Sequence, residues 1–183
     1  LIYLTSSLVF FVGLYDDKFN SGILIRIVFQ LIACLILVGS EIRIYDLGIL
    51  YGHTISLGVF GILLTILTMI SYINAINFTD GLDGLASGYI INCISSIIIF
   101  SLINGNSSNL EPLFFLLLIL IFFIFANFGI VFPKCFLGDS GSTFLGFLVS
   151  AYLIYFTMPD NRYFHPVLAL WAAPLPTFDF LNV

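Results

Sequence analysis

The chain alternates between long stretches without a charged residue and short polar connections. Four stretches of at least 20 residues contain no Asp, Glu, Lys or Arg: residues 47–79, 84–110, 112–133 and 140–159. A helix needs about 20 residues to cross the ~30 Å hydrocarbon layer of a membrane. The pattern therefore predicts an all-α fold, a polytopic bundle of transmembrane helices.

Turn-forming residues divide these stretches into about seven spans, which we treat as one domain over residues 1–183. We expect the spans at residues 1–15, 22–39, 57–76, 85–103, 113–132, 143–158 and 166–180. The sequence starts inside one apolar segment and ends just after another, so we expect a fragment that is truncated at both ends. The longest connection, residues 40–56, is expected on the membrane surface, and nothing in it suggests chemistry.

Counting the crossings indicates where the acidic residues meet. If Asp16 and Asp17 lie on one side of the membrane, the chain returns to that side near Asp80 and Asp83, then near Asp139, and finally at residue 179. Six of the eight aspartates are therefore predicted at one membrane face. The other face receives acids and bases together, from the connections around residues 41–46, 111 and 160–162.

Composition agrees with a membrane protein and excludes several other classes. The chain is 61% hydrophobic and 8% charged, whereas a soluble domain carries about 25% charged residues. Five basic residues cannot form the basic face of a nucleic-acid-binding protein, so no nucleic-acid partner is expected. The basic residues are too few for the positive-inside rule to assign an orientation.

Several carboxylates at one site repel each other unless a cation neutralises them. Oxygen ligands without nearby His or Cys suit Mg²⁺, which usually takes one or two carboxylates and completes its shell with phosphates. The predicted aspartate face therefore resembles a metal–phosphate site. The alternative is that these acids only cap helices or lie in solvated loops.

Two segments carry the polar groups of this face. In residues 74–86, Asn77 and Asp80 could share one side of a helix that Gly81 and Gly84 then end. Alternatively, an Asn here could cap the end of one helix and an Asp the start of the next. Residues 138–142, Gly-Asp-Ser-Gly-Ser, open an apolar span with small residues whose backbone N–H groups form an anion-binding seat. There, Asp139 could hold the ion that bridges a diphosphate.

In order and spacing, these motifs resemble those of the polyprenyl-phosphate N-acetylhexosamine-1-phosphate transferases, glycosyltransferase family 4. The matching segments are Gly-Leu-Tyr-Asp-Asp-Lys-Phe at 13–19, followed by Ile25-Arg26 and Gln30; Asn-Ala-Ile-Asn-Phe-Thr-Asp-Gly-Leu-Asp-Gly-Leu at 74–85; Phe-Leu-Gly-Asp-Ser-Gly-Ser-Thr-Phe-Leu-Gly at 136–146; and His165-Pro166 with Ala-Leu-Trp-Ala-Ala-Pro-Leu-Pro-Thr-Phe-Asp at 169–179. The resemblance implies transfer of a sugar-1-phosphate, GlcNAc-1-phosphate above all, from a UDP-sugar to undecaprenyl phosphate with release of UMP. It also implies a multi-pass protein of the inner membrane with its active site facing the cytoplasm, and it allows a homodimer.

The resemblance assigns roles to ten residues. Asn77 and Asp139 are the implied ligands of Mg²⁺, or of Mn²⁺ in its place. The implied catalytic residues are Asp16, Asp17 and Asp139. The implied substrate-binding residues are Asn74, Asp80, Asp83, Phe136, Gly138 and Ser140, with Phe136 offering a ring on which the uracil base can stack.

The sequence also permits other interpretations. The related phospho-MurNAc-pentapeptide transferases share much of the pattern, and a cation-coupled transporter could also place Asn and Asp beside broken helices. The attacking group could be the lipid phosphate itself or an aspartate that forms a covalent intermediate. The family's His-rich cytoplasmic motif is missing from the chain, and the crossing count puts His165 on the opposite face.

Overall fold

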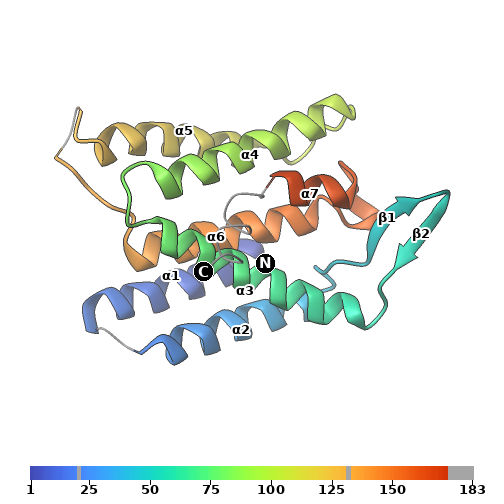
Figure 1. Cartoon of the computed structure of the whole chain (residues 1–183), viewed down its shortest axis with the longest axis horizontal. Coiled ribbons are helices and arrows are strands. Elements are labelled where there is room, and N and C mark those ends of the chain that lie inside the picture. The colour runs from blue at the N-terminus through green and yellow to red at the C-terminus, as the bar shows by residue number, and fades with distance from the viewer. Residues whose placement is uncertain (20–21, 131–132, 173–183) are drawn as a thin grey trace.

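The computed structural model describes residues 1–19, 22–130 and 133–172, and this part of the chain folds into a bundle of helices with one β-hairpin (Figure 1). The helices are α1 (Ile2–Phe19), α2 (Ile23–Gly39), α3 (Phe60–Thr79), α4 (Leu85–Ile103), α5 (Glu111–Asn127), α6 (Gly138–Tyr155) and α7 (Pro166–Ala172), with a short 3₁₀ turn η1 (Pro159–Asn161). The strands are β1 (Asp46–Leu50) and β2 (His53–Ser56).

The helical segments follow the hydrophobic pattern, and the two largest shifts of a helix end lie at the end of α5 and the start of α6. Helix α5 ends at Asn127, five residues before the predicted end of its span, and Gly129 follows with a left-handed φ of 67°. Helix α6 begins at Gly138, so the small polar residues 138–142 form its first turns rather than a loop before it. Of the span predicted at 166–180, the described part is α7, and the rest lies outside the described residues.

The β-hairpin was not predicted, so the all-α expectation holds for the bundle but not for the connection between α2 and α3. The strands β1 and β2 pair antiparallel, with Leu50 opposite His53. Tyr51 and Gly52 join them with φ values of 50° and 84°. Positive φ at both positions gives a two-residue turn whose twist matches that of the strands. A Tyr-Gly turn is a much weaker signal than Asn-Gly, which explains why the sequence pattern missed it.

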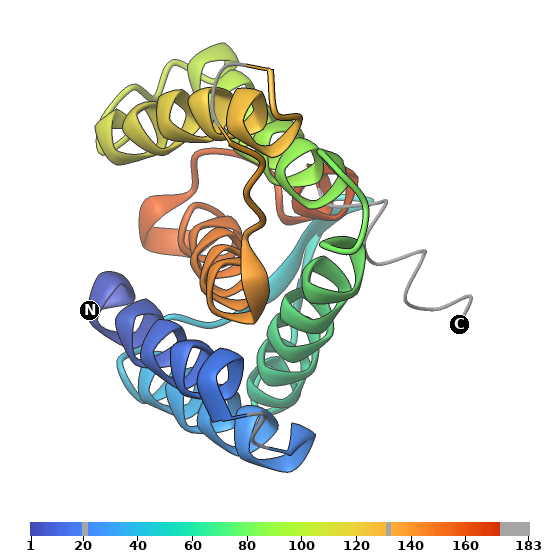
Figure 2. The ribbon, with the colours of Figure 1, turned by 90° about the vertical axis from the view of Figure 1, so that its left-hand side faces the viewer.

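Helix α6 lies at the centre of the bundle and packs mainly against α1 and α3 (Figure 2). Small residues allow these close approaches. A Cβ atom on Gly13 of α1 would lie 2.4 Å from Cα of Ser140, and one on Gly146 of α6 would lie 3.0 Å from Cα of Ile73. Phe147 of α6 is completely buried between these helices. Backbone contact thus sets the position of α6 on both sides.

The outer surface of the bundle is strongly apolar. Large hydrophobic side chains are exposed along α2 and α5, among them Leu24, Leu35, Phe115 and Phe122. In the described part of the chain, α3 and α4 are long and apolar enough to cross a membrane, and α2 and α5 are apolar helices of 17 residues. An apolar exterior on such helices is typical of a bundle surrounded by lipid.

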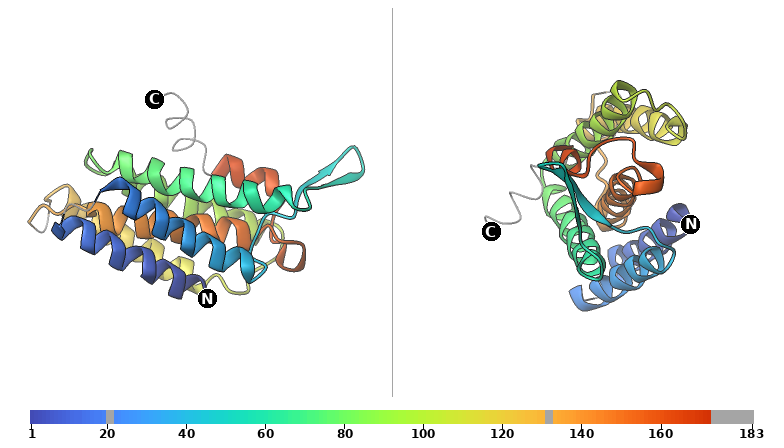
Figure 3. Two further views of the ribbon diagram at one scale, coloured as in Figure 1. Left: turned by 90° about the horizontal axis from the view of Figure 1, so that it is seen from below. Right: turned by 90° about the vertical axis from the view of Figure 1, so that its right-hand side faces the viewer.

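The helices run along the long axis of the molecule, so their connections gather at two opposite ends (Figures 1 and 3). The connections α1–α2, α3–α4 and α5–α6 lie at one end, called here the aspartate end because it carries Asp16, Asp17, Asp80, Asp83 and Asp139. The hairpin and α7 lie at the other end. The predicted sixth aspartate, at position 179, lies outside the described residues.

Candidate active site

The aspartate end is organised around the N-terminus of α6. The carboxylate of Asp17, on α1, accepts hydrogen bonds from the backbone N–H groups of Asp139, at 2.9 Å, and Ser140, at 3.1 Å. Gly138 has a φ of +68°, and a Cβ atom there would lie 3.3 Å from Oδ2 of Asp17. The anion-binding seat predicted at this helix start is therefore filled by a carboxylate from the neighbouring helix.

Asp139 carries the most contacts in the site. Its Oδ2 lies 2.7 Å from Nη1 of Arg26, on α2, and its Oδ1 accepts a hydrogen bond of 2.7 Å from the amide of Asn77, on α3. The Asn77 amide also donates to the hydroxyl of Ser142 at 2.8 Å. Helices α2 and α3 thus each deliver one group to this carboxylate of α6. The Asp139 side chain remains 40% exposed, so a ligand can still reach it.

Arg26 belongs to the segments that match the family, but we assigned it no role in the site from the sequence. Besides contacting Asp139, its guanidinium lies 3.3 Å from Oδ2 of Asp16, whose residue is only 6% exposed. Arg26 therefore supplies the positive charge between two acids that would otherwise repel each other. The available signal was that Arg26 is the one charged residue in the apolar segment 23–39, a position where a charge is costly and usually functional.

Asp80 lies directly after α3, beside the backbone that begins α6. Partial burial raises the pKa of the Asp80 carboxyl to about 6, and the neighbouring charges of Asp139 and Asp17 add to this rise. Hydrogen bonds to the backbone of Gly138 and Leu137 act in the opposite direction. The structure therefore brings Asp80 to the same end of α6 as Asp17 and Asp139.

A second group lies where the α3–α4 and α5–α6 connections meet. The ammonium of Lys134 is 2.6 Å from Oδ2 of Asp83 and 5.2 Å from the centre of the Phe136 ring, which is 55% exposed. The buried side chain of Asn127 joins the two connections, because it accepts the Gly84 N–H and donates to a backbone carbonyl at residue 135. Lys134 and Asn127 were not identified from the sequence, since neither is part of a local pattern.

The structure does not bring Asn74 into either group. Its amide nitrogen donates to Oε1 of Gln30, on α2, at 3.2 Å and to the carbonyl of Ile70 at 2.8 Å. Asn74 thus lies between α2 and α3, on the side of Asn77 away from the aspartate end. Ser140 is buried and uses its N–H for Asp17.

The residues fit Mg²⁺ in kind, although they do not form a complete protein cage. Asp139 and Asn77 offer a carboxylate and an amide at hydrogen-bond distance from each other. Within the described residues, no three His, Cys, Asp or Glu side chains gather closely enough to hold a metal ion. This set matches the habit of Mg²⁺ of binding one or two protein groups and taking its remaining ligands from phosphates and water.

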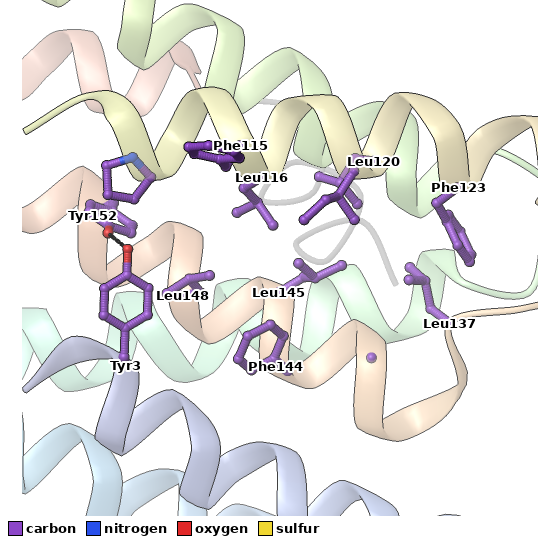
Figure 4. A pocket seen from close by; sticks show the side chains of 13 residues that line it. Tyr3, Phe115, Leu116, Leu120, Phe123, Leu137, Phe144, Leu145, Leu148 and Tyr152 are labelled. Carbon is purple, nitrogen blue, oxygen red and sulfur yellow. Dashed lines mark hydrogen bonds between the residues drawn. The ribbon is translucent and has the colours of Figure 1, made fainter.

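A cavity of about 520 Å³ runs beside this site, between α5 on one side and α6 and α1 on the other (Figure 4). Its lining is almost entirely apolar. The hydroxyl groups of Tyr3 and Tyr152 are hydrogen-bonded to each other at the end away from the aspartates, and Leu137 lies at the near end. Such a lining cannot satisfy a charged nucleotide, so we place the polar chemistry at the aspartate end rather than in this cavity.

Comparisons with known proteins assign the chain to a family. The family model described as Glycosyl transferase family 4 matches residues 1–157. Curated relatives named undecaprenyl-phosphate alpha-N-acetylglucosaminyl 1-phosphate transferase include proteins from Salmonella typhi (32% identity, covering 100% of this chain and 51% of the relative), Escherichia coli strain K12 (31%, 94% and 48%) and Haemophilus influenzae (33%, 94% and 50%). The chain spans about half the length of the curated relatives it matches. Because the family model covers most of its residues, the chain belongs to glycosyl transferase family 4.

Proposed function

We propose that the protein transfers GlcNAc-1-phosphate from UDP-GlcNAc to undecaprenyl phosphate and releases UMP. The observation that carries this proposal is the convergence of three helices on Asp139, with Arg26 and Asn77 touching its carboxylate and Asp17 holding the helix start that bears it. The names of the relatives supply the acceptor, undecaprenyl phosphate, and the transferred group, N-acetylglucosaminyl 1-phosphate. The UDP-linked donor follows from the family resemblance. A site at the end of the bundle also suits a reaction between a water-soluble donor and a membrane lipid.

We infer that Asp139 and Asn77 hold Mg²⁺, or Mn²⁺, together with the diphosphate of the donor. When bound, the ion would neutralise the phosphate charges and stabilise UMP as a leaving group. The need for positive charge is large, because two unit charges 4 Å apart at an effective dielectric of ~20 repel by about 4 kcal/mol. Arg26 adds a cation at the same carboxylate.

We propose that the lipid phosphate attacks directly. Its oxygen forms a bond to the sugar-bearing phosphorus while the bond from that phosphorus to the UMP oxygen breaks, and the electron pair leaves with UMP. A phosphomonoester with a second pKa near 6 is mostly dianionic at pH 7, so no strong general base is required. Both oxygens of Asp17 already accept backbone N–H groups, and this weakens Asp17 as a covalent nucleophile.

We assign the uridine end of the donor to the group formed by Asp83, Lys134 and Phe136. The exposed Phe136 ring offers a stacking face for the base, and Lys134 offers a positive charge beside it. Asp80, next to the start of α6, would border the same space. The site would face the cytoplasm, where UDP-sugars are made, with the bundle in the inner membrane.

Replacing Asp139 by Asn tests the proposal in the complete gene product, reconstituted in lipid nanodiscs. We expect UMP release from UDP-GlcNAc and undecaprenyl phosphate to fall at least 100-fold, because the central carboxylate charge is lost. Asp160→Asn is the matched control, since Asp160 is an exposed acid near the opposite end. Full activity of Asp139→Asn would refute the assignment of this site.

The sugar is tested separately, by letting UDP-GlcNAc compete with UDP-MurNAc-pentapeptide in the same UMP-release assay. We expect UDP-GlcNAc to be the preferred donor. Preference for the pentapeptide donor would favour the phospho-MurNAc-pentapeptide transferase instead. Solute uptake into proteoliposomes without UMP release would favour a transporter, although the acids here lie at helix ends rather than at mid-membrane depth, where transporters bind their substrates.

A further inference from the structure

Two amide side chains, the buried Gln30 and the half-buried Asn74, meet between α2 and α3, about one helical turn from the groups at the aspartate end. Gln30 is 3% exposed, and its Oε1 accepts a hydrogen bond of 3.2 Å from Asn74. The second N–H of the Asn74 amide donates to the carbonyl of Ile70 at 2.8 Å. Both donors of this amide are therefore used within the protein, and neither is left to bind a substrate.

The pair stands in a fixed relation to the catalytic groups. Gln30 lies four residues after Arg26 on α2, and Asn74 lies three residues before Asn77 on α3, so each pair shares a helix face. Helices α2 and α3 thus meet at two levels about one turn apart. At the upper level Arg26 and Asn77 both contact Asp139, each at 2.7 Å, and at the lower level Gln30 binds Asn74.

Between apolar helices, a buried amide is costly unless its hydrogen bonds are made. A slide or rotation of α2 against α3 would break the Gln30–Asn74 hydrogen bond and leave the buried Gln30 carbonyl without this donor. The same movement would change the separation of Arg26 from Asn77. The hydrogen bond between Gln30 and Asn74 can therefore keep Arg26 and Asn77 at the separation at which both contact Asp139.

We propose that Gln30 and Asn74 are positioning residues, which lock α2 against α3 so that Arg26 and Asn77 close on Asp139 from two sides. The inference rests on the proposed function, and it gives Asn74 a different role from the substrate contact implied by the family resemblance. Gln30 and Asn74 affect the reaction only through the positions of Arg26 and Asn77.

The test compares Gln30→Met with the exchanged pair Gln30→Asn/Asn74→Gln in the complete gene product in nanodiscs. Two quantities are measured: steady-state UMP release, separated into kcat and KM, and binding of Mn²⁺ followed by electron paramagnetic resonance, which does not depend on turnover. For Gln30→Met we expect kcat to fall about 10- to 100-fold, since misplacement by ~1 Å can cost this much. We expect Mn²⁺ binding to weaken at least fivefold. With the metal ion at a saturating concentration in the kinetic assay, we expect the KM for UDP-GlcNAc to stay within twofold.

The exchanged pair keeps one long and one short amide, and we expect it to restore kcat and Mn²⁺ binding to within threefold of the original protein. Thr65→Val is the matched control. Thr65 is a fully buried polar residue of α3 that binds the Ile44 N–H near the hairpin end, so its loss should lower thermal stability without changing kcat or Mn²⁺ binding.

Any one of three results would overturn the inference. The first is a Gln30→Met protein that is less stable but has normal kcat and Mn²⁺ binding. The second is an exchanged pair that restores neither kcat nor Mn²⁺ binding, and the third is an increase in the KM for UDP-GlcNAc caused by Asn74 variants alone. Failure of the proposed function looks different. In that case the unmodified protein would release no UMP, and the Mn²⁺ comparison would still decide whether the pair positions Asp139 and Asn77.

Discussion

Replacing Gly13 by Ala should separate α1 from α6 and damage the site without touching any acid. A Cβ atom at this position would lie 2.4 Å from Cα and 3.0 Å from N of Ser140. Non-bonded carbon atoms prefer about 3.5–4.0 Å, so the two helices must move apart by roughly 1 Å. Both contact atoms belong to the backbone, and no side-chain rotation can relieve the clash.

The consequence follows from where Asp17 lies, one turn further along α1. Its hydrogen bonds to the N–H groups of Asp139 and Ser140 measure 2.9 and 3.1 Å, and an additional ~1 Å takes them beyond the range of about 3.2 Å in which such bonds are strong. Hydrogen bonds to a charged group contribute about 1.5–3 kcal/mol each. We therefore expect Gly13→Ala to reduce UMP release on the order of 100-fold.

The assay is UMP release by the reconstituted complete gene product, with the amount of folded protein measured alongside. Gly88→Ala is the matched control, because Gly88 lies in helix α4 and a Cβ atom there would meet nothing within 4 Å. We expect that control to keep full activity and to gain up to about 1 kcal/mol in stability from helix propensity. Normal turnover by folded Gly13→Ala protein would refute the claim that this contact sets the Asp17 geometry.

Three further changes test other parts of the structure. Arg26→Met should abolish UMP release because it leaves Asp139 without its cation, and Arg26→Lys should restore part of it; equal activity of both variants would contradict this role. Gly48→Ala should detach the hairpin from α7, because a Cβ atom at this position would lie 1.9 Å from the His165 ring. We expect faster amide hydrogen exchange in the hairpin, measured by mass spectrometry, and unchanged exchange would refute this prediction. Lys134→Met should raise the KM for UDP-GlcNAc several-fold. The free energy of unfolding should change by less than about 1 kcal/mol, because the lost ion pair is exposed. An unchanged KM would argue against a position of Lys134 beside the nucleotide.

The sequence alone was enough to predict the helices of the bundle, because an apolar run of sufficient length has few alternatives to a helix in a membrane. It was also enough to predict that Asp17, Asp80 and Asp139 share one end, since the side of the membrane follows from counting crossings. These predictions depend on local hydrophobicity and chain order, which a one-dimensional pattern records.

Other features required the tertiary structure. Arg26 becomes a partner of Asp139 only because α2 packs against α1 and α3, the two helices that hold α6. Asn74 points toward Gln30 rather than toward the site because α2 lies beside α3. The hairpin is held by contacts such as the hydrogen bond from the Ile49 N–H to a residue 116 positions later in the chain. Which helix neighbours which depends on close packing at residues such as Gly13, and that packing is a property of two surfaces together rather than of either segment alone.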